Sequence, residues 1–206
     1  MVEVTPLRHI DTFRRVFSQP DVFCQFAGDI LEVTVAADHV ETAFVYPKTI
    51  GERKTEYDLF VDDKEHEIIV AIQHIGGTDL FNRFVYSHAM NLIEQITGWG
   101  GYRFERTVYT IIILTGTLED HNINSSFSVL DMNPIDEFNR TVEMFPHRLV
   151  LLTPRLLNDQ TPPKVKMWLK LIQDSLDGKI DETDFPSPIF QKVIREIEKQ
   201  PSSDNT

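Results

Sequence analysis

The sequence predicts an α/β fold in which helices flank a mixed central sheet. Five short segments have the alternating or β-branched apolar residues that are typical of strands, and helical segments precede, separate and follow them. The predicted order is two helices, three strands, one helix, two strands and a closing helical part, which is typical of an α/β sandwich. At 206 residues, the chain is long enough for one domain with a substantial buried core.

Two helices are predicted near the N-terminus. The first has Asp11 as its N-cap and places Phe13, Val16 and Phe17 on one face. The second helix runs from Pro20 through Leu31, with Asp21 as its cap. Both helices therefore offer an apolar face to a core.

Three strands follow these helices. Alternation predicts the first over residues 40–46, which Pro47 and the polar turn 51–54 end. The second covers 57–61. The third, 67–73, has a continuous apolar centre, which suits burial on both faces of a sheet.

The remaining chain alternates helices and strands. Gly76-Gly77 breaks the chain, and Asp79 caps a helix that extends to about Thr97. The later elements are a strongly β-branched central strand over 108–114, a strand over 148–152, a helix after Pro162-Pro163 that contains 166–171, and an amphipathic helix over about 189–198. From Pro201 onward we expect a frayed tail. We assign residues 1–178 to the main domain and 179–206 to a helical extension with that tail.

Composition excludes several classes of protein. No apolar run approaches the roughly 20 residues of a membrane helix, and the N-terminus lacks a signal-peptide pattern, so we expect no membrane association and a cytoplasmic location. Cys24 is the only cysteine, which excludes an internal disulfide and a zinc site built from cysteines. We interpret its apolar surroundings as core packing.

The charge balance argues against indiscriminate nucleic-acid binding. The formal net charge is −12, whereas such binding depends on neutralising phosphates. A local basic face is still possible, and a scattered, solvated set of charges fits equally well. The candidate residues are Arg14, Arg15, Arg53, Lys54, Arg83, Arg103 and Arg106.

Asp58 and Gln73 form the pattern with the clearest chemical meaning. Asp58 lies in one predicted strand and Gln73 ends the next, across a charged hairpin. Hydrolysis of a phosphodiester needs an activated water and a neutralised phosphate, and Mg²⁺ held by oxygen ligands serves both needs. Without further context, Asp58 also fits an inert edge position, and Gln73 a polar residue that closes a strand.

A wider pattern favours the catalytic interpretation. The chain resembles the Rpn/YhgA-like recombination-promoting nucleases, a transposase-like group of the PD-(D/E)XK superfamily, over roughly residues 8–175. The matching segments, in the family's order, are Asp11-x-Phe13-Arg14-x-x-Phe17, Pro20 to Leu31, Asp58 with Gln73, Phe81-x-Arg83-x-x-Tyr86, Gln95, Gly101-Tyr102, Val108 to Leu114 and Trp168-Leu169. Each segment is a weak signal alone, and their shared order is more specific.

The resemblance implies a restriction-endonuclease-like core and a metal-dependent DNA endonuclease. Asp58 would bind Mg²⁺, for which Mn²⁺ could substitute, the carbonyl of Ile72 would be a second ligand, and Gln73 would orient the attacking water. Asp11 is a weaker metal-ligand candidate. Arg83 and Tyr86, three residues apart on one helix face, would contact the phosphates of nucleic acid.

Ala71 departs from the family pattern at its most important position. The family places a catalytic Glu where this chain has Ala71. A methyl group offers neither charge nor oxygen to a metal, so we expect this chain to cleave DNA very slowly or not at all. Ala71 either replaces a glutamate of an active enzyme or is native to a non-cleaving protein. The intact pattern around it favours the first origin.

Three functions follow from these observations. The first is a magnesium-dependent endonuclease of recombination, mobile elements or defence, inactivated at Ala71. The second is a naturally inactive nuclease fold that binds DNA or a partner protein. The third is an α/β domain unrelated to nucleic acid, for which the overall acidity is the best support. A homodimer or a regulatory protein partner is compatible with either of the first two.

Overall fold

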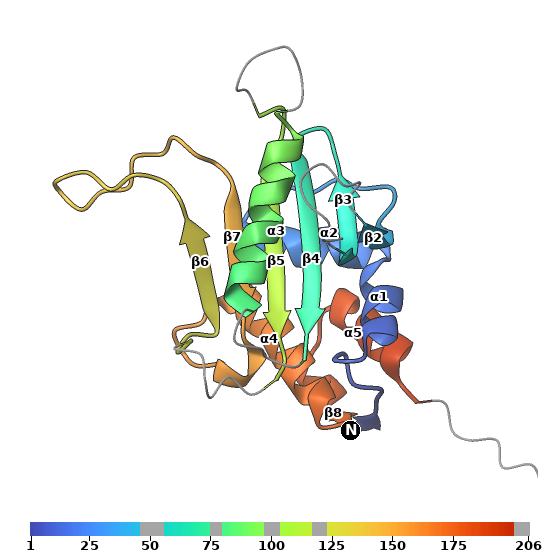
Figure 1. The fold of residues 1–206 in the computed structure, drawn as a ribbon. Coiled ribbons are helices and arrows are strands. Elements are labelled where there is room, and N and C mark those ends of the chain that lie inside the picture. The colour runs from blue at the N-terminus through green and yellow to red at the C-terminus, as the bar shows by residue number, and fades with distance from the viewer. Residues whose placement is uncertain (46–55, 75–79, 97–103, 117–122, 200–206) are drawn as a thin grey trace, which may run out of the picture.

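The computed structural model describes residues 1–45, 56–74, 80–96, 104–116 and 123–199. At its centre is a six-stranded mixed sheet with helices on both faces (Figure 1). This confirms the predicted α/β class and the mixed central sheet. The strands of the sheet are β2 (Glu41–Val45), β3 (Glu56–Asp62), β4 (His66–Gln73), β5 (Thr107–Leu114), β6 (Phe127–Asp131) and β7 (Arg148–Leu152).

The strand order is β2-β3-β4-β5-β7-β6. The three central strands β4, β5 and β7 are parallel to one another. On one side β3 pairs antiparallel with β4 and β2 pairs antiparallel with β3, and on the other side β6 pairs antiparallel with β7. Central parallel strands are buried on both faces, which explains why β4 and β5 have nearly continuous apolar sequences. The connection from β4 to β5 passes through helix α3 (Leu80–Glu94), as a parallel pair requires.

Helices cover the two faces unequally. Helix α3 lies over one face of the sheet, and the other helices lie over the opposite face (Figure 1). Those helices are α1 (Ile10–Phe17), α2 (Pro20–Leu31), α4 (Pro163–Leu176) and α5 (Pro188–Ile197). Short 3-10 turns, η1 (Pro154–Leu156) and η2 (Glu182–Asp184), precede α4 and α5.

A second, two-stranded sheet joins distant parts of the chain. Strand β1 (Val2–Glu3) pairs antiparallel with β8 (Lys179–Ile180). The N–H of Thr5 also donates to the carbonyl of Ile197 over 2.7 Å. Residues 179–197, which we expected as an extension, contribute Ile180, Phe190 and Ile194 to the same core as α1 and α2.

The main core is centred on Trp168. Its side chain is fully buried, and its ring makes edge contacts with Phe26 and Phe190 at centroid distances of 5.3 and 4.6 Å. Phe17 lies at 5.9 Å, so aromatic rings from α1, α2, α4 and α5 meet at one point. The indole N–H donates to Asp29 over 2.9 Å, which satisfies its one buried polar group.

Polar contacts fix α3 on the other face. The hydroxyl of Tyr57 in β3 donates to the carbonyl of Ser87 over 3.2 Å and lies 3.2 Å from the side-chain oxygen of Asn91. His88 lies 2.9 Å from the hydroxyl of Thr110 in β5. Because these groups are buried, their hydrogen bonds determine where α3 sits on the sheet.

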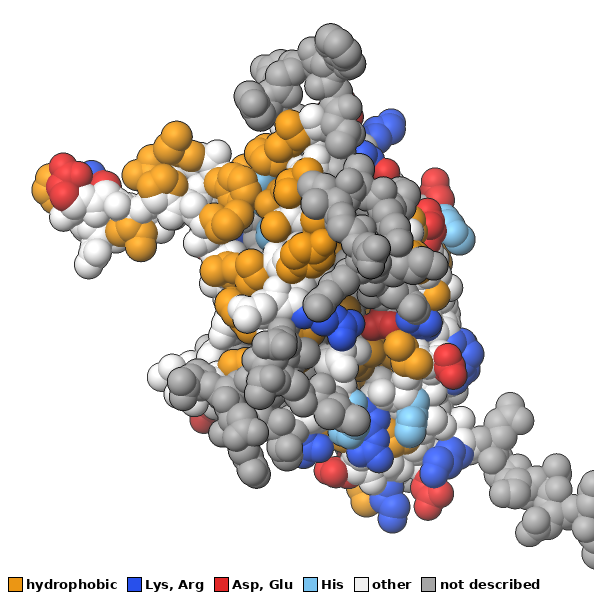
Figure 2. All heavy atoms as spheres, viewed as in Figure 1, with side chains coloured by type: hydrophobic (Ala, Val, Ile, Leu, Met, Phe, Trp, Pro, Cys, Tyr) orange, Lys and Arg blue, Asp and Glu red, His pale blue; other side chains and the backbone are white. Residues whose placement is uncertain are grey.

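Residues 132–147, between β6 and β7, project from the body as an arm (Figure 1). The side-chain oxygen of Asn133 accepts the N–H groups of Met144 and Phe145 over 2.7 and 2.6 Å and so holds the base of the arm together. Ile135, Phe138 and Met144 are each about 70% exposed. Apolar side chains thus gather on the arm and on the adjoining face that carries α3 (Figure 2).

Some local predictions were wrong. His9 and Gln19 are the N-caps, so Asp11 and Asp21 lie in the first turns of α1 and α2 instead. An acid in the first turn still stabilises a helix through its dipole. Strand β6 was not predicted. The expected turn at 51–54, the Asp79 cap and the tail from Pro201 lie outside the described residues.

The remaining predicted elements agree with the structure within a few residues at each described end. Cys24 is partly buried, and its thiol lies 3.9 Å from the carbonyl of Ala37. In the described part of the chain, no helix has the length and apolar character needed to cross a membrane.

We predict that Trp168→Ala destabilises the protein by about 3–5 kcal/mol, because it leaves a large cavity between four helices. Urea unfolding followed by circular dichroism measures this change. Met144→Ala is the matched control, since Met144 is exposed on the arm and its loss should change the free energy of unfolding by less than about 0.5 kcal/mol. Equal effects of the two substitutions would contradict this core.

We also predict a loss of stability between pH 6.5 and 4. Burial, with the nearby His147, lowers the pKa of His88 to about 4. An unfolded histidine takes up a proton near pH 6.5. Below that pH the unfolded state binds a proton that the folded state does not bind, so the free energy of unfolding falls as the pH falls.

Unfolding free energies measured across this pH range should fall less steeply for His88→Gln than for the unmodified protein. His39→Gln, which changes an exposed side chain, should keep the original slope. An unchanged slope in His88→Gln would show that His88 does not carry the effect.

Candidate functional site

Asp58 is a buried carboxylate at the start of β3. The residue is only 5% exposed, although it lies near the end of a strand. Burying an ionised carboxylate is costly unless hydrogen bonds or opposite charges compensate it. The contacts of Asp58 therefore explain why the fold tolerates it.

Groups from two different elements contact this carboxylate. Arg14 of α1 donates to one oxygen through Nε at 3.1 Å and through Nη2 at 2.8 Å. The main-chain N–H of Ile72 in β4 donates to the other oxygen at 2.7 Å. Asp58 thus joins α1, β3 and β4 through charge-assisted hydrogen bonds, which are stronger than neutral ones.

The contact with Ile72 replaces a main-chain bond of the sheet. The regular pairing of β3 with β4 reaches Leu59 opposite Val70. Beyond that pair, the carboxylate of Asp58 accepts the N–H that a strand carbonyl would otherwise accept. The carboxylate therefore lies close to the plane of the sheet. The carbonyl of Ile72 extends to the same side as its N–H, because both groups of one strand residue point to the same neighbour.

The backbone of β3 is irregular at this point. Tyr57 contacts α3, whereas Leu59, two residues later, packs in the main core on the other face. Regular alternation would place both on one face. On the other side, Ala43 of β2 has φ of 55° and lies between the paired residues Thr42 and Phe44. Left-handed backbone at a residue other than glycine is uncommon in proteins as a whole. Where it occurs, it is often close to a functional site.

Ala71 and Gln73 lie on β4 beside Asp58. The side chain of Ala71 packs against the smaller core cluster that includes Phe84 of α3. Gln73 is the last residue of β4, and its carbonyl accepts the N–H of Thr115 over 2.9 Å. A longer side chain at position 71 would therefore extend from β4 toward the α3 face, next to the strand that carries Asp58.

At this position the described residues supply one carboxylate, whereas the predicted metal needs more oxygen ligands. Among the described residues, no group of three or more His, Cys, Asp or Glu side chains could hold a metal ion. Asp58 is bound by Arg14, and Ala71 contributes no oxygen. Mg²⁺ prefers several oxygen ligands. The present donor set does not fit Mg²⁺ or Mn²⁺, and a glutamate at position 71 is the residue that would complete it.

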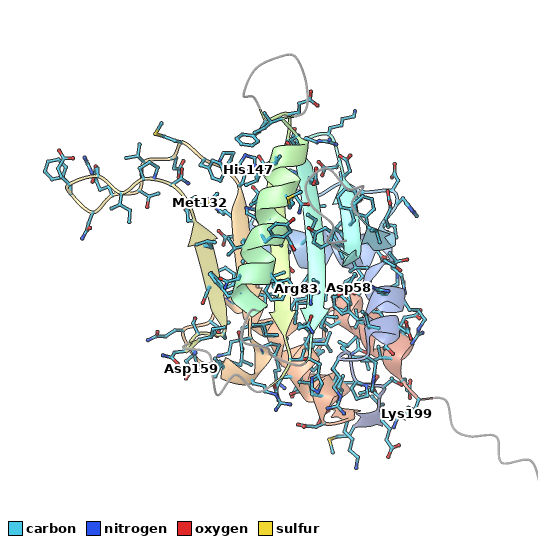
Figure 3. The ribbon with its side chains drawn as sticks, viewed as in Figure 1. Asp58, Arg83, Met132, His147, Asp159 and Lys199 are labelled. Atoms are coloured by element: carbon cyan, nitrogen blue, oxygen red, sulfur yellow. The ribbon has the colours of Figure 1, made fainter. Side chains whose placement is uncertain are left out.

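The weaker candidates lie around this centre. Asp11 is exposed in the first turn of α1, three residues before Arg14 and so on the same side of the helix. Arg83 and Tyr86 are exposed on α3. Figure 3 places Arg83 and Asp58 near the same end of the sheet.

Arg83 also acts on a neighbour of Asp58. Burial raises the pKa of Tyr57 to about 12, Glu67 adds to this increase, and the charge of Arg83 opposes it. Arg83 is therefore close enough to influence the residue next to Asp58.

Among the described residues, the other predicted basic side chains do not form one face. Arg15 pairs with Glu196, and Arg106 pairs with Asp62. Arg83 lies near the start of α3, whereas the N–H of Arg106 donates to the side chain of Gln95, just past the end of that helix, which at about 1.5 Å per residue is roughly 20 Å long. Arg53, Lys54 and Arg103 lie outside the described residues.

Sequence reasoning missed Arg14 as the partner of Asp58. The two residues are 44 positions apart, and only the packing of α1 against β3 brings them together. The available signal was the position of Arg14 within the Asp11-to-Phe17 segment, on the side of the helix that also carries Asp11.

We predict that Arg14→Met destabilises the protein by about 3 kcal/mol or more, because it leaves the buried Asp58 carboxylate without its cation. Thermal or urea unfolding measures the change. Arg15→Met is the control, because Arg15 and Glu196 are exposed and such pairs contribute less than about 1 kcal/mol. The double variant Arg14→Met/Asp58→Asn should recover part of the loss. A loss no greater than that of Arg15→Met would contradict the role of Arg14.

Comparisons with models of protein families, with curated proteins and with solved structures found no match to this chain. A nuclease assignment is therefore a proposal that depends on the residues themselves. The structure supports the α/β architecture of that assignment and brings Asp58, Ala71 and Gln73 onto neighbouring strands.

Proposed function

We propose that this protein has a PD-(D/E)XK-type nuclease core that acts on DNA and that Ala71 makes the chain, as written, inactive in cleavage. Its ancestral or parental activity would be metal-dependent hydrolysis of phosphodiesters in recombination, mobile-element biology or defence. The proposal combines the sequence resemblance with the arrangement of Asp58, Ala71 and Gln73.

One observation carries the proposal. A buried carboxylate, Asp58, occupies the point where β3 and β4 stop pairing regularly, beside Ala71 of the next strand. A purely structural aspartate has little reason to be there, since a main-chain carbonyl could accept the N–H of Ile72 without the cost of burying a charge. Buried charges at irregular strand positions are frequent features of functional sites.

The chemistry explains the importance of position 71. In active nucleases of this type, a divalent metal held by carboxylates neutralises the phosphate and activates water. Here Gln73 could orient a water by hydrogen bonding, but an amide does not act as a base at neutral pH. Without the glutamate, we expect a rate at least 10²–10³-fold lower than that of a complete site, by analogy with the loss of other charge-stabilising groups.

A second function is favoured by the contacts of Asp58. Arg14 already supplies the positive charge that a metal would supply to this carboxylate. Such an arrangement suits a protein that binds DNA, or a partner, through a nuclease fold without cutting. In both functions we propose a cytoplasmic protein that works with DNA, and a homodimer or a regulatory subunit fits either.

We predict that Ala71→Glu cuts supercoiled plasmid in the presence of Mg²⁺, whereas the unmodified chain does not. The new carboxylate would extend beside Asp58 and complete the oxygen ligands of the metal. Gel electrophoresis of plasmid incubated with Mg²⁺ or Mn²⁺, and with chelator, measures the activity.

Two controls separate the carboxylate from other effects of the substitution. In Ala71→Gln the new side chain has nearly the volume of glutamate but no charge, so this variant should remain inactive. Adding Asp58→Asn to Ala71→Glu should abolish the recovered cleavage. A well-folded Ala71→Glu protein that cuts nothing would instead favour the DNA-binding or partner-binding module.

A further inference from the structure

Beyond the carboxyl ends of the parallel strands, His74 and Arg155 both contact Thr115, and Arg8 and His9 lie within electrostatic range of His74. Arg8 and His9 precede α1, His74 directly follows β4, and Arg155 lies in η1 after β7. Burial lowers the pKa of His74, and the charges of Arg8, Arg155 and His9 lower it further. These charges can act on His74 only from nearby. We call these four residues the basic cluster.

Thr115 connects the basic cluster to the strand that carries Gln73. Thr115 is fully buried and directly follows β5. Its hydroxyl lies 3.1 Å from Nδ1 of His74, and its N–H donates to the carbonyl of Gln73 over 2.9 Å. Its own carbonyl accepts Nε–H of Arg155 at 2.9 Å. The orientation of the Arg155 guanidinium is therefore fixed, while its terminal nitrogens remain on an exposed residue.

The arginines of the basic cluster differ from most basic residues of this protein. Many other cations make ion pairs, among them Arg14, Arg15, Arg106, Arg140, Lys170 and Lys192. Within the described part of the chain, no such pair with a carboxylate involves Arg8 or Arg155. For a protein of net charge −12, this is a locally positive surface.

The two ends of β4 have opposite charge. At its amino end, an open pocket includes six acidic residues. They are Asp21, Asp38, Glu41, Asp62, Asp63 and Glu65. At its carboxyl end is the basic cluster, of which His74 directly follows Gln73. An anionic ligand that lies along this side of the sheet would be repelled from the first end and attracted to the second.

The basic cluster also lies next to the candidate site. Ile72, which contacts Asp58, lies in β4 two residues before His74, or about 7 Å along an extended chain. In open α/β sheets, ligands commonly bind beyond the carboxyl ends of the parallel strands. Strands β4, β5 and β7 all end here, so the position and the charge point to the same ligand class.

We propose that the basic cluster binds the phosphate backbone of the DNA strand next to the Asp58–Ala71 site. This inference rests on the proposed function and adds where the DNA lies. Arg155, oriented by Thr115, presents two terminal nitrogens to a phosphate, a geometry that guanidinium groups favour. Arg8 contacts a neighbouring phosphate, and His74 and His9 offer hydrogen-bond donors between them.

The test is DNA binding by the full chain at several salt concentrations. A fluorescent 20-base-pair duplex is titrated with the unmodified protein, with Arg8→Ala/Arg155→Ala and with Arg140→Ala/Lys192→Ala, and anisotropy gives each Kd. The last variant is the matched control, because it removes the same charge from ion-paired residues elsewhere on the surface.

Arg8→Ala/Arg155→Ala should raise Kd by about tenfold for each arginine, since hydrogen bonds to charged groups contribute about 1.5 kcal/mol or more. The slope of log Kd against log salt should become shallower by roughly 2, because about 0.9 is lost per phosphate contact. The control variant should keep the original slope. Equal Kd and slope in all three proteins would overturn the proposal.

Two further measurements keep the outcomes distinct. Arg8→Ala alone leaves the Arg155–Thr115 bond intact and should raise Kd by about tenfold even if the double variant folds poorly. If Ala71→Glu cuts plasmid and keeps its cutting and DNA binding after Arg8→Ala/Arg155→Ala is added, this inference fails while the proposed nuclease stands. If the unmodified chain binds no DNA and Ala71→Glu cuts none, both fail.

Discussion

The carboxylate of Asp58 is the interaction on which the arrangement of the candidate site depends. It accepts hydrogen bonds from a helix side chain and from a strand N–H, so three elements meet at one buried charge. The position and orientation of the Asp58 carboxylate are restricted, because each oxygen must keep its hydrogen-bond donor when water is excluded. The irregular backbone at Ala43 and the break in the β3–β4 ladder are consistent with that constraint.

Positive and negative charges lie at opposite ends of the parallel strands. Its net charge is strongly negative, yet the carboxyl ends of the parallel strands carry the basic cluster, while acids line the pocket at the amino end of β4. A protein of this kind would hold nucleic acid through a small surface and repel it elsewhere. Its binding should therefore be weak and sensitive to salt, unless a partner adds further contacts.

The fold could be predicted from the sequence where the residues themselves require one structure. Strands β4, β5 and β7 were predicted because β-branched and apolar runs suit buried parallel strands. Strand β6 was missed, because Phe127–Asp131 is short, half polar and at the edge of the sheet. Both caps were misplaced by two residues, because a cap depends on local φ and ψ that composition does not determine.

The site was predictable only in part for a different reason. Asp58 and Gln73 could be placed on neighbouring strands because a short hairpin separates them. The ion pair with Arg14 joins residues far apart in sequence and follows from how α1 packs, which no periodicity reveals. The basic cluster assembles from three separate segments, and a single arginine before a helix gives no sign of it.

The pairing of β1 with β8 has a consequence for how the protein is made. Val2 and Glu3 find their strand partners only at residues 180 and 179, and Phe17 and Phe26 pack on Trp168. A ribosome that adds about 5–20 residues per second needs on the order of 10 s to reach those partners. During that time the apolar faces of α1 and α2 lack most of their native cover, so the nascent chain offers chaperones a binding site that the finished protein conceals.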